Sequence, residues 1–274
     1  MKRRFSLALL ALFLLGWSAS LALQRGGGPR YFSREDNPAP LPPDWQEKAE
    51  FARARLAYPN YTGPAYGRSR RGGGGGGSWT TDYPKSDRIF LQGVRRLTRI
   101  QTQPIEQVVS LDNDEIFQYP FVYAVEVGHW GLSDPQAQKL REFLLRGGFL
   151  MTDDFHGSIE WEVFMQSMSR VFPDRPVVDL ANSDEIFHVL YDVDQRVQVP
   201  GLPALNSGVT FERDGVVPRW RGVLDDKGRI MVAICHNMDL GDAWEWADAA
   251  WYPERYATLA YQIGINYIVY SMTH

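Results

Sequence analysis

The chain has 274 residues, with 29 Lys and Arg against 33 Asp and Glu, which gives a formal net charge of −4. Hydrophobic residues make up 44% and charged residues 23%, a composition that excludes a wholly disordered chain. The mild acidity excludes a general nucleic-acid binder, which needs a basic surface. The single cysteine, Cys235, excludes an intrachain disulfide and a metal site built from several cysteines.

The first 22 residues have the layout of a secretory signal peptide. Three basic residues precede an apolar run from Phe5 to Leu15, and Ser20-Leu21-Ala22 provides a cleavage site flanked by small residues. The apolar run is shorter than the roughly 20 residues that a membrane-spanning helix needs. We therefore expect export to the periplasm or the cell exterior. The alternative is an N-terminal anchor that is not cleaved, and we expect no other contact with a membrane.

Two segments of low complexity precede the main part of the chain. Residues 23–47 are rich in Gly, Pro and charge and are expected to form a flexible linker. Residues 68–78 combine arginines with six glycines, which are costly in entropy to order. A phosphate-binding loop would need Lys and then Ser or Thr after its last glycine. Because Ser78-Trp79 follow instead, we expect a surface loop within a domain of residues 48–274.

Strands and helices alternate along this domain. Apolar runs and alternation of period two predict strands at 52–58, 108–111, 121–127, 149–152 and 177–180. Helical spacing of apolar residues predicts helices at 85–98, at 133–146, around 161–168 before Pro173, and at 254–272. Ser133 and Gln136 form a predicted capping box, and Gly147-Gly148 are expected to end that helix.

A hairpin is expected near the end of the chain. Residues 219–224 and 229–235 flank Asp225-Asp226-Lys227-Gly228, which is typical of a turn between antiparallel strands. The alternation of strands and helices before it indicates a mostly parallel sheet. We therefore predict an α/β fold, a flavodoxin-like three-layer sandwich with a C-terminal antiparallel hairpin.

Three segments carry a resemblance to a known family. Residues 140–154 run from a helix through Gly-Gly and a strand to Asp-Asp, Tyr119-Pro120 precede the strand that ends near Gly128-His129, and residues 183–187 read Ser-Asp-Glu-Ile-Phe. Together they resemble a bacterial domain family of unknown function with a class I glutamine amidotransferase-like fold. The trehalose-utilisation-like proteins share the helix, Gly-Gly, strand pattern. The resemblance covers residues 48–273 and says little about activity.

The chain departs from that family pattern at the nucleophile. The resemblance implies a cysteine at a strand-to-helix elbow and a later His-x-Glu, but Asp153-Asp154 follow the 149–152 strand. Cys235 lies inside a late apolar strand, where we expect a buried and inert thiol. Glutamine hydrolysis by the thiol route is therefore not expected.

The candidate ligand-binding residues follow the predicted strands, because ligands of open parallel sheets bind beyond the carboxyl ends of the strands. They are His129 and Trp130 after the third strand, Asp153 and Asp154 after the fourth, and His236, Asn237 and Asp239 after the last.

Three of these residues are candidate catalytic groups. Asp153, Asp154 and His129 offer carboxylates and an imidazole, which suit proton transfer or a hard metal ion. The structural alternative is that Asp153 or Asp154 caps the helix that starts near Ser158 or satisfies loop amides, and that His129 bonds a backbone carbonyl. His156 lies in a turn beside a glycine, where we expect it to be exposed.

The other candidates also have structural alternatives. Asn237 and Asp239 precede Gly241 and fit an Asx-turn. Trp244, Trp246, Trp251 and Tyr252 alternate with acidic residues, and such indoles stack on sugar rings, hold a cation or pack as a lid over the core.

Two hypotheses of function follow. The first is an exported amidotransferase-like domain that lacks the nucleophilic cysteine and acts as a ligand-binding or interaction module. The second is a hydrolase that uses Asp153 or Asp154 with His129, or a divalent metal, on a carbohydrate-type substrate. A small molecule or a glycan is the expected ligand, and the residues identify no cofactor.

Overall fold

The computed structural model describes residues 41–47, 49–64 and 78–274. The predicted signal peptide, most of the predicted linker and the glycine run therefore lie outside the described residues. The end of the predicted linker is described, and there Asp44 pairs with Arg95 on the first helix of the domain.

One sheet of seven strands forms the centre of the domain, in the order β2-β1-β3-β4-β7-β6-β5. Five neighbouring strands run parallel, as the pairing of each with the next shows: β2 (Gln107–Ser110), β1 (Arg53–Ala57), β3 (Phe121–Val125), β4 (Phe149–Asp153) and β7 (Ile230–His236). The strand β6 (Arg219–Leu224) pairs antiparallel with β7 and with the short β5 (Val178–Asp179). The predicted parallel sheet and hairpin are confirmed.

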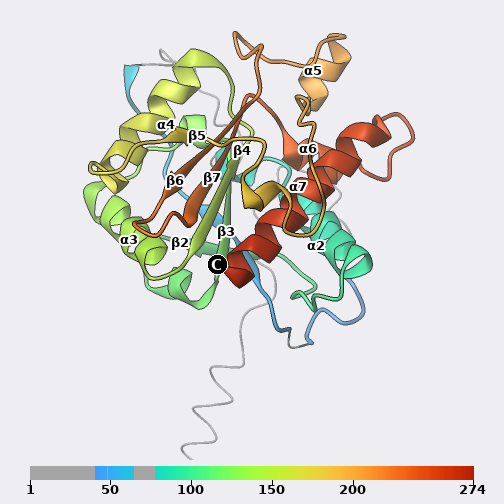
Figure 1. Ribbon diagram of the computed structural model, residues 1–274, viewed down its shortest axis with the longest axis horizontal. Coiled ribbons are helices and arrows are strands. Elements are labelled where there is room, and N and C mark those ends of the chain that lie inside the picture. The colour runs from blue at the N-terminus through green and yellow to red at the C-terminus, as the bar shows by residue number, and fades with distance from the viewer. Residues whose placement is uncertain (1–40, 48, 65–77) are drawn as a thin grey trace, which may run out of the picture. The chain divides into compact units, whose positions relative to one another are not determined.

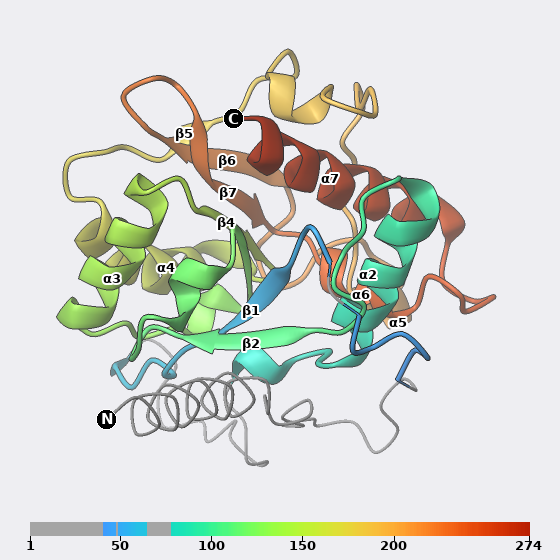
Figure 2. The same cartoon turned by 90° about the horizontal axis from the view of Figure 1, so that it is seen from below.

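Helices cover both faces of this sheet (Figures 1 and 2). One face packs against α3 (Asp134–Leu145) and α4 (Gly157–Val171), and the other against α2 (Lys85–Leu97), α6 (Leu240–Glu245) and α7 (Glu254–Thr273). The domain is therefore a three-layer sandwich of the flavodoxin-like kind. None of the described helices has the length and apolar character that crossing a membrane requires.

Short helical segments complete the chain. They are η2 (Ser78–Thr80), η3 (Glu115–Gln118), η4 (Val127–His129), η5 (Glu185–Phe187) and α5 (Leu202–Asn206). The segment η4 begins where the predicted 121–127 strand stops early, because Glu126 adopts the left-handed conformation with φ of 52° and turns the chain out of the sheet.

The alternation of side chains along β3 explains the two cores. Phe121, Tyr123 and Val125 pack in the layer of α2, α6 and α7, whereas Val122 and Ala124 pack in the layer of α3 and α4. All five are fully buried. A strand that is apolar on both faces is expected in the middle of a parallel sheet.

The capping predicted for α3 is confirmed. The Ser133 side chain accepts a hydrogen bond from the Gln136 backbone N–H, and the Gln136 side chain accepts one from the Ser133 backbone N–H. At the other end Gly147 has a φ of 104°, and the N–H groups of Gly147 and Gly148 return to carbonyls of the last helical turn. These caps place β4 directly after the helix.

A buried ion pair joins α2 to β1. Arg53 and Arg55 lie on the α2 face of the sheet and are at most 2% exposed, and both pair with Asp87. The guanidinium of Arg53 also packs 4.6 Å from the ring centroid of Tyr123. Because both arginines come from one strand, Asp87 fixes the position of α2 against the sheet.

Candidate functional site

The segments that follow β1, β3, β4 and β7 meet at one edge of the sheet, which we call the carboxyl edge. Ligands of open α/β sheets bind at this edge. Asp153 is the last residue of β4, and Asp154 follows it. Asp239 comes three residues after the end of β7. The structure therefore places these predicted residues on neighbouring segments.

The carboxyl group of Asp153 joins β4 to α6. Its Oδ2 atom accepts hydrogen bonds from the backbone N–H groups of Leu240 at 2.8 Å and Gly241 at 3.0 Å, and from the Tyr123 hydroxyl at 3.2 Å. The Oδ1 atom has no partner within the described part of the chain. Burial raises the pKa of Asp153 to about 7, although the two backbone hydrogen bonds lower it.

Asp154 is also buried and has a φ of 53°. Its Oδ1 atom lies 3.1 Å from Nε2 of His156. Burial, followed by the negative charges of Glu126 and Asp82, raises the pKa of Asp154 well above its ordinary value. The protonated form of this carboxyl group is therefore favoured, and a proton can be shared with the imidazole.

The expectation that His156 is exposed is wrong, because the residue is only 4% exposed. Its ring lies against Asp154 within the edge of the sheet. Burial, followed by the charges of His236 and Arg213, lowers the pKa of His156 to about 3. The imidazole is therefore neutral at physiological pH.

Neither Asp153 nor Asp154 caps α4. The first backbone N–H groups of that helix, on Gly157 and Ser158, donate to Asn237 Oδ1 at 2.8 Å and to a carboxylate oxygen of Asp214 at 2.9 Å. Asn237 therefore holds the start of α4 beside the end of β7, which is a structural role.

Asp82, Asp239 and Asp242 form a cluster that we call the acidic trio. Each offers a carboxylate oxygen, and these oxygens lie within 4.8 Å of one another. Asp82 precedes α2, whereas Asp239 is the N-cap of α6 and accepts a hydrogen bond from the Asp242 N–H at 2.7 Å. Asp239 thus has a structural role as a helix N-cap, in place of the Asx-turn expected for it, and also belongs to the trio.

Other contacts hold the trio in position. Asp242 accepts hydrogen bonds from the Leu202 N–H at 2.5 Å and from the Trp246 indole N–H at 3.3 Å. The Oδ2 atom of Asp82 is buried and has no hydrogen-bond partner among residues 41–47, 49–64 and 78–274. A Cβ atom on Gly241 would lie 2.8 Å from that oxygen, so only glycine leaves the space free.

No Lys or Arg among the described residues forms an ion pair with the acidic trio. Burial raises the pKa of Asp82, and the charges of Asp242 and Glu245 raise it further. Burial likewise raises the pKa of Asp239, followed by the charges of Asp154 and Asp242. The trio thus joins two buried carboxyl groups and a partly buried one, and among the described residues only the charge of Arg55 offsets Asp82 in part.

A second titratable cluster lies at the carboxyl ends of β3 and β4. Nδ1 of His129 is 2.7 Å from Glu126, and its Nε2 is 3.8 Å from Glu160. Glu160 is only 2% exposed, lies 2.5 Å from Arg213 and accepts a hydrogen bond from the backbone N–H of His156. We call Glu126, His129 and Glu160 the histidine–glutamate cluster.

The pKa values in this cluster are shifted by burial and by neighbouring charge. Burial lowers the pKa of His129, but the hydrogen bond and charge of Glu126 outweigh burial and raise it overall. Burial raises the pKa of Glu160 to about 7 against the lowering effect of His129. Groups that titrate near neutral pH are suited to general acid–base chemistry.

The structure does not bring every predicted residue into the acidic trio or the histidine–glutamate cluster. Trp130 is fully buried and donates its indole N–H to the Phe164 carbonyl, so it belongs to the core. His236 packs against both Phe155 and Trp161. Burial lowers the pKa of His236 to about 4.

Cys235 is fully buried, as expected. Its Sγ atom lies 3.9 Å from the Tyr267 hydroxyl. Burial raises the pKa of the thiol well above its ordinary value, so the reactive thiolate is disfavoured.

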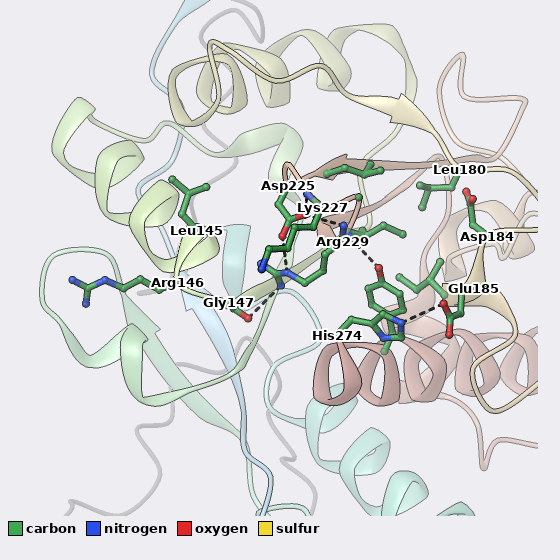
Figure 3. Close-up of a pocket in the computed structure, with 15 residues that line it drawn as sticks. Leu145, Arg146, Gly147, Leu180, Asp184, Glu185, Asp225, Lys227, Arg229 and His274 are labelled. Carbon is green, nitrogen blue, oxygen red and sulfur yellow. Dashed lines mark hydrogen bonds and ion pairs between the residues drawn. The ribbon is translucent and has the colours of Figure 1, made fainter.

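The opposite edge of the sheet has an open cavity of about 620 Å³ (Figure 3). It is lined by Gly147 just before β4 and by residues at the start of β7, which places it at the amino ends of the parallel strands. Arg229 lies 3.2 Å from Asp225, and His274 lies 3.2 Å from Glu185. These charged side chains are paired within the cavity wall, which contains none of the candidate residues.

The described structure therefore defines an α/β sandwich with a carboxylate-rich carboxyl edge. Residues 65–272 match the family model of a domain of unknown function, DUF4159. The match covers most of the chain, and the protein belongs to this family. No curated protein matches the sequence.

Four acidic residues of the edge were not among the predicted site residues: Asp82, Glu126, Glu160 and Asp242. The sequence contains a signal for two of them, Asp242 and Glu160. Asp239 and Asp242 have the spacing of a helix N-cap and its first turn, which predicts α6 and two neighbouring carboxylates. Glu160 lies one helical turn after His156, which the sequence places in a turn beside a glycine. Nothing near Asp82 in the sequence indicates its distant partners.

Proposed function

We propose that this domain is an exported, amidotransferase-like module without a thiol nucleophile that binds a small ligand through a divalent cation at the carboxyl edge. The acidic trio is the observation that carries the proposal. Its three carboxylate oxygens lie within 4.8 Å of one another and come from two distant segments of the chain. Carboxylates are the ligands that hard divalent cations prefer.

The spacing of the trio fits a calcium-sized ion. Calcium binds oxygen at about 2.3–2.6 Å, so oxygens on opposite sides of the ion lie up to about 5 Å apart. Magnesium binds oxygen at about 2.0–2.1 Å, which limits that separation to about 4 Å. The carboxylate oxygens of the trio lie within 4.8 Å of one another, which satisfies the limit for calcium.

The electrostatics of the site support the same proposal. Each ion buried without compensation costs several kcal/mol, and the described residues give the trio no Lys or Arg ion pair. The raised pKa values of Asp82 and Asp239 mean that protons compensate this charge in part. A cation provides the alternative compensation and would displace those protons.

Calorimetry on the full chain tests the proposal. We expect titration with CaCl₂ at pH 7.5 to give one site per chain, and the variants Asp82→Asn and Asp242→Asn to weaken binding at least tenfold. The matched control is Asp194→Asn, because Asp194 is an exposed carboxylate outside the edge. Absence of calcium, magnesium and manganese binding to the folded wild type would refute the proposal.

A hydrolase is the second candidate function, and the histidine–glutamate cluster favours it. Glu126 orients His129 through the 2.7 Å contact with Nδ1, which leaves Nε2 toward Glu160. The His129 side chain is 22% exposed, so a substrate at the edge can reach it. In this function His129 would move a proton while Asp154 and His156 hold one nearby.

Hydrolysis of a glycan or ester panel by the full chain tests this second candidate. We expect turnover to fall at least a hundredfold in His129→Ala and about tenfold in Glu126→Gln, which keeps the size of the orienting residue. No turnover of any substrate in the panel, with or without calcium, removes this candidate and leaves the binding module.

Export is supported by the basic, apolar and small-residue segments of residues 1–22. The amidotransferase-like relationship is supported by the resemblance of residues 140–154 and by the three-layer sandwich. Expression of the full chain in a Gram-negative bacterium, followed by fractionation and N-terminal sequencing, tests export. We expect a soluble periplasmic form that begins at Leu23. Retention in the membrane fraction would favour the anchor.

A further inference from the structure

An exposed tryptophan packs against the tryptophan that bonds to the acidic trio. Trp251 is 54% exposed, which makes it the only exposed aromatic side chain in the described part of the chain. Its ring packs against Trp246, with centroids 5.1 Å apart and planes tilted by 47°. Because a tryptophan gains much stability from burial, an indole held in solvent requires an explanation.

The tryptophan pair is connected to the trio by a direct contact. The Trp246 indole N–H donates to Asp242 Oδ1 at 3.3 Å. On Trp246 the Lys85 ammonium lies 3.3 Å from the ring centroid and 3.4 Å from Glu245. Trp246 is therefore fixed between the protein's own cation and a carboxylate, whereas Trp251 keeps an open surface.

The turn that carries Trp251 is fixed by its neighbour. Tyr252 is 5% exposed and donates its hydroxyl to the Pro200 carbonyl at 2.9 Å. The rings of Trp251 and Tyr252 meet edge to face with centroids 6.1 Å apart. Tyr252 is thus anchored in the core, while the adjacent Trp251 indole remains in solvent against Trp246.

We infer that Trp251 is a stacking platform for a pyranose ring of a neutral saccharide whose hydroxyl groups reach the acidic trio. This inference rests on the proposed function and names its ligand class. A pyranose offers an apolar C–H face to an indole and hydroxyl groups at its rim, and carboxylates or a bound cation take those hydroxyls as partners. An organic cation fits less well, because Lys85 already occupies the position between Trp246 and Glu245.

Binding of neutral trisaccharides to the full chain tests the inference. The probes are maltotriose, cellotriose and chitotriose, titrated by calorimetry with 1 mM CaCl₂. We expect at least one to bind, Trp251→Ala to weaken it at least tenfold, and Trp251→Phe to restore part of the affinity. Met272→Ala is the control, because Met272 is similarly exposed on the last helix, outside the carboxyl edge, and should bind as wild type does.

Calcium titrations of the same variants separate the two proposals. Trp251→Ala should bind calcium as tightly as wild type, since its indole is not a cation ligand. If calcium binds but no trisaccharide does, or if Trp251→Ala binds the saccharide as wild type does, the stacking inference is wrong while the proposed cation site stands. If the saccharide binds through Trp251 without any calcium binding, the cation proposal is wrong and the stacking inference stands.

Discussion

Asp82 and Asp87 are close in the sequence at the start of α2, yet their surroundings are opposite. Asp87 is 1% exposed and pairs with both Arg53 and Arg55. Oδ2 of Asp82 is buried without a hydrogen-bond partner in the described part of the chain, and Asp82 lies near Asp239 and Asp242. Asp87 is compensated by ion pairs within the fold, whereas the acidic neighbours of Asp82 are offset only in part by the charge of Arg55.

The pKa values of the two residues follow this difference. Burial raises the pKa of Asp87, but the charges of Arg55 and Arg53 outweigh it and bring the value below the ordinary one. Burial and the charges of Asp242 and Glu245 both raise the pKa of Asp82. A buried charge with its partner in the same chain serves stability, whereas the acidic trio indicates a partner that comes from outside.

The largest effect is expected at the compensated site. Asp87→Asn leaves two buried guanidinium groups without their carboxylate, and removing one partner of such a pair costs about 3–5 kcal/mol. Urea unfolding followed by circular dichroism measures the loss. A change below about 1 kcal/mol would show that the pair does not hold α2 to the sheet.

The next effect is expected at the uncompensated site. Calcium at a hundred times its Kd should stabilise the folded chain by about 2.7 kcal/mol, since it binds the folded state alone. The thermal shift should be larger at pH 8 than at pH 5, because the raised pKa values of Asp82 and Asp239 keep protons on the trio at the lower pH. Equal shifts at both pH values would contradict this linkage.

The stability of the chain as a function of pH, measured in EDTA, tests the pKa values of the buried groups. Asp153 and Glu160 both have a pKa raised to about 7, so the stability they contribute is present at low pH and is lost as pH rises through 7. His156 and His236 have lowered pKa values, so they change the folding stability only below about pH 6.5, where the unfolded chain takes up protons.

Between pH 6.5 and 8.5 these two carboxyl groups lower the free energy of unfolding by about 1–2 kcal/mol. The raised pKa values of Asp82, Asp154 and Asp239 act in the same direction, so we expect a fall of at least this size. Urea unfolding at several pH values measures it. A stability that stays constant or rises over this range would show that these groups are ionised at lower pH than their burial implies.

The smallest effect is a gain in stability. Asp82→Asn removes one like charge from the trio, and Asn tolerates the left-handed backbone at this position, where φ is 59°. Without calcium the variant should be more stable than wild type by about 1 kcal/mol, and calcium should no longer raise its melting temperature. A destabilised variant that still responds to calcium would exclude Asp82 from the site.

The sequence predicts the sheet because its signals are local. The apolar runs of β3 and β4 and the capping residues of α3 each specify an element within a few residues. The rule that ligands bind beyond parallel strands then brings Asp153 and Asp154 to the carboxyl edge.

The rest of the site depends on packing between distant segments. Asp82 meets Asp239 only because α2 and α6 lie together, where the Ser86 hydroxyl donates to the Gly241 carbonyl at 3.0 Å. Likewise, the segment of His156 is packed against distant residues: the N–H of the adjacent Gly157 donates to Asn237 at 2.8 Å, and the Gly157 carbonyl lies 3.1 Å from His236 Nε2. A turn beside a glycine does not reveal these contacts.

Crystals of the full chain soaked in MnCl₂ show whether the acidic trio holds a divalent cation, because manganese gives an anomalous signal and prefers oxygen ligands. We expect one strong anomalous peak within about 2.5 Å of carboxylate oxygens from Asp82, Asp239 and Asp242. A folded, fully soaked crystal with no peak between these three residues would contradict it.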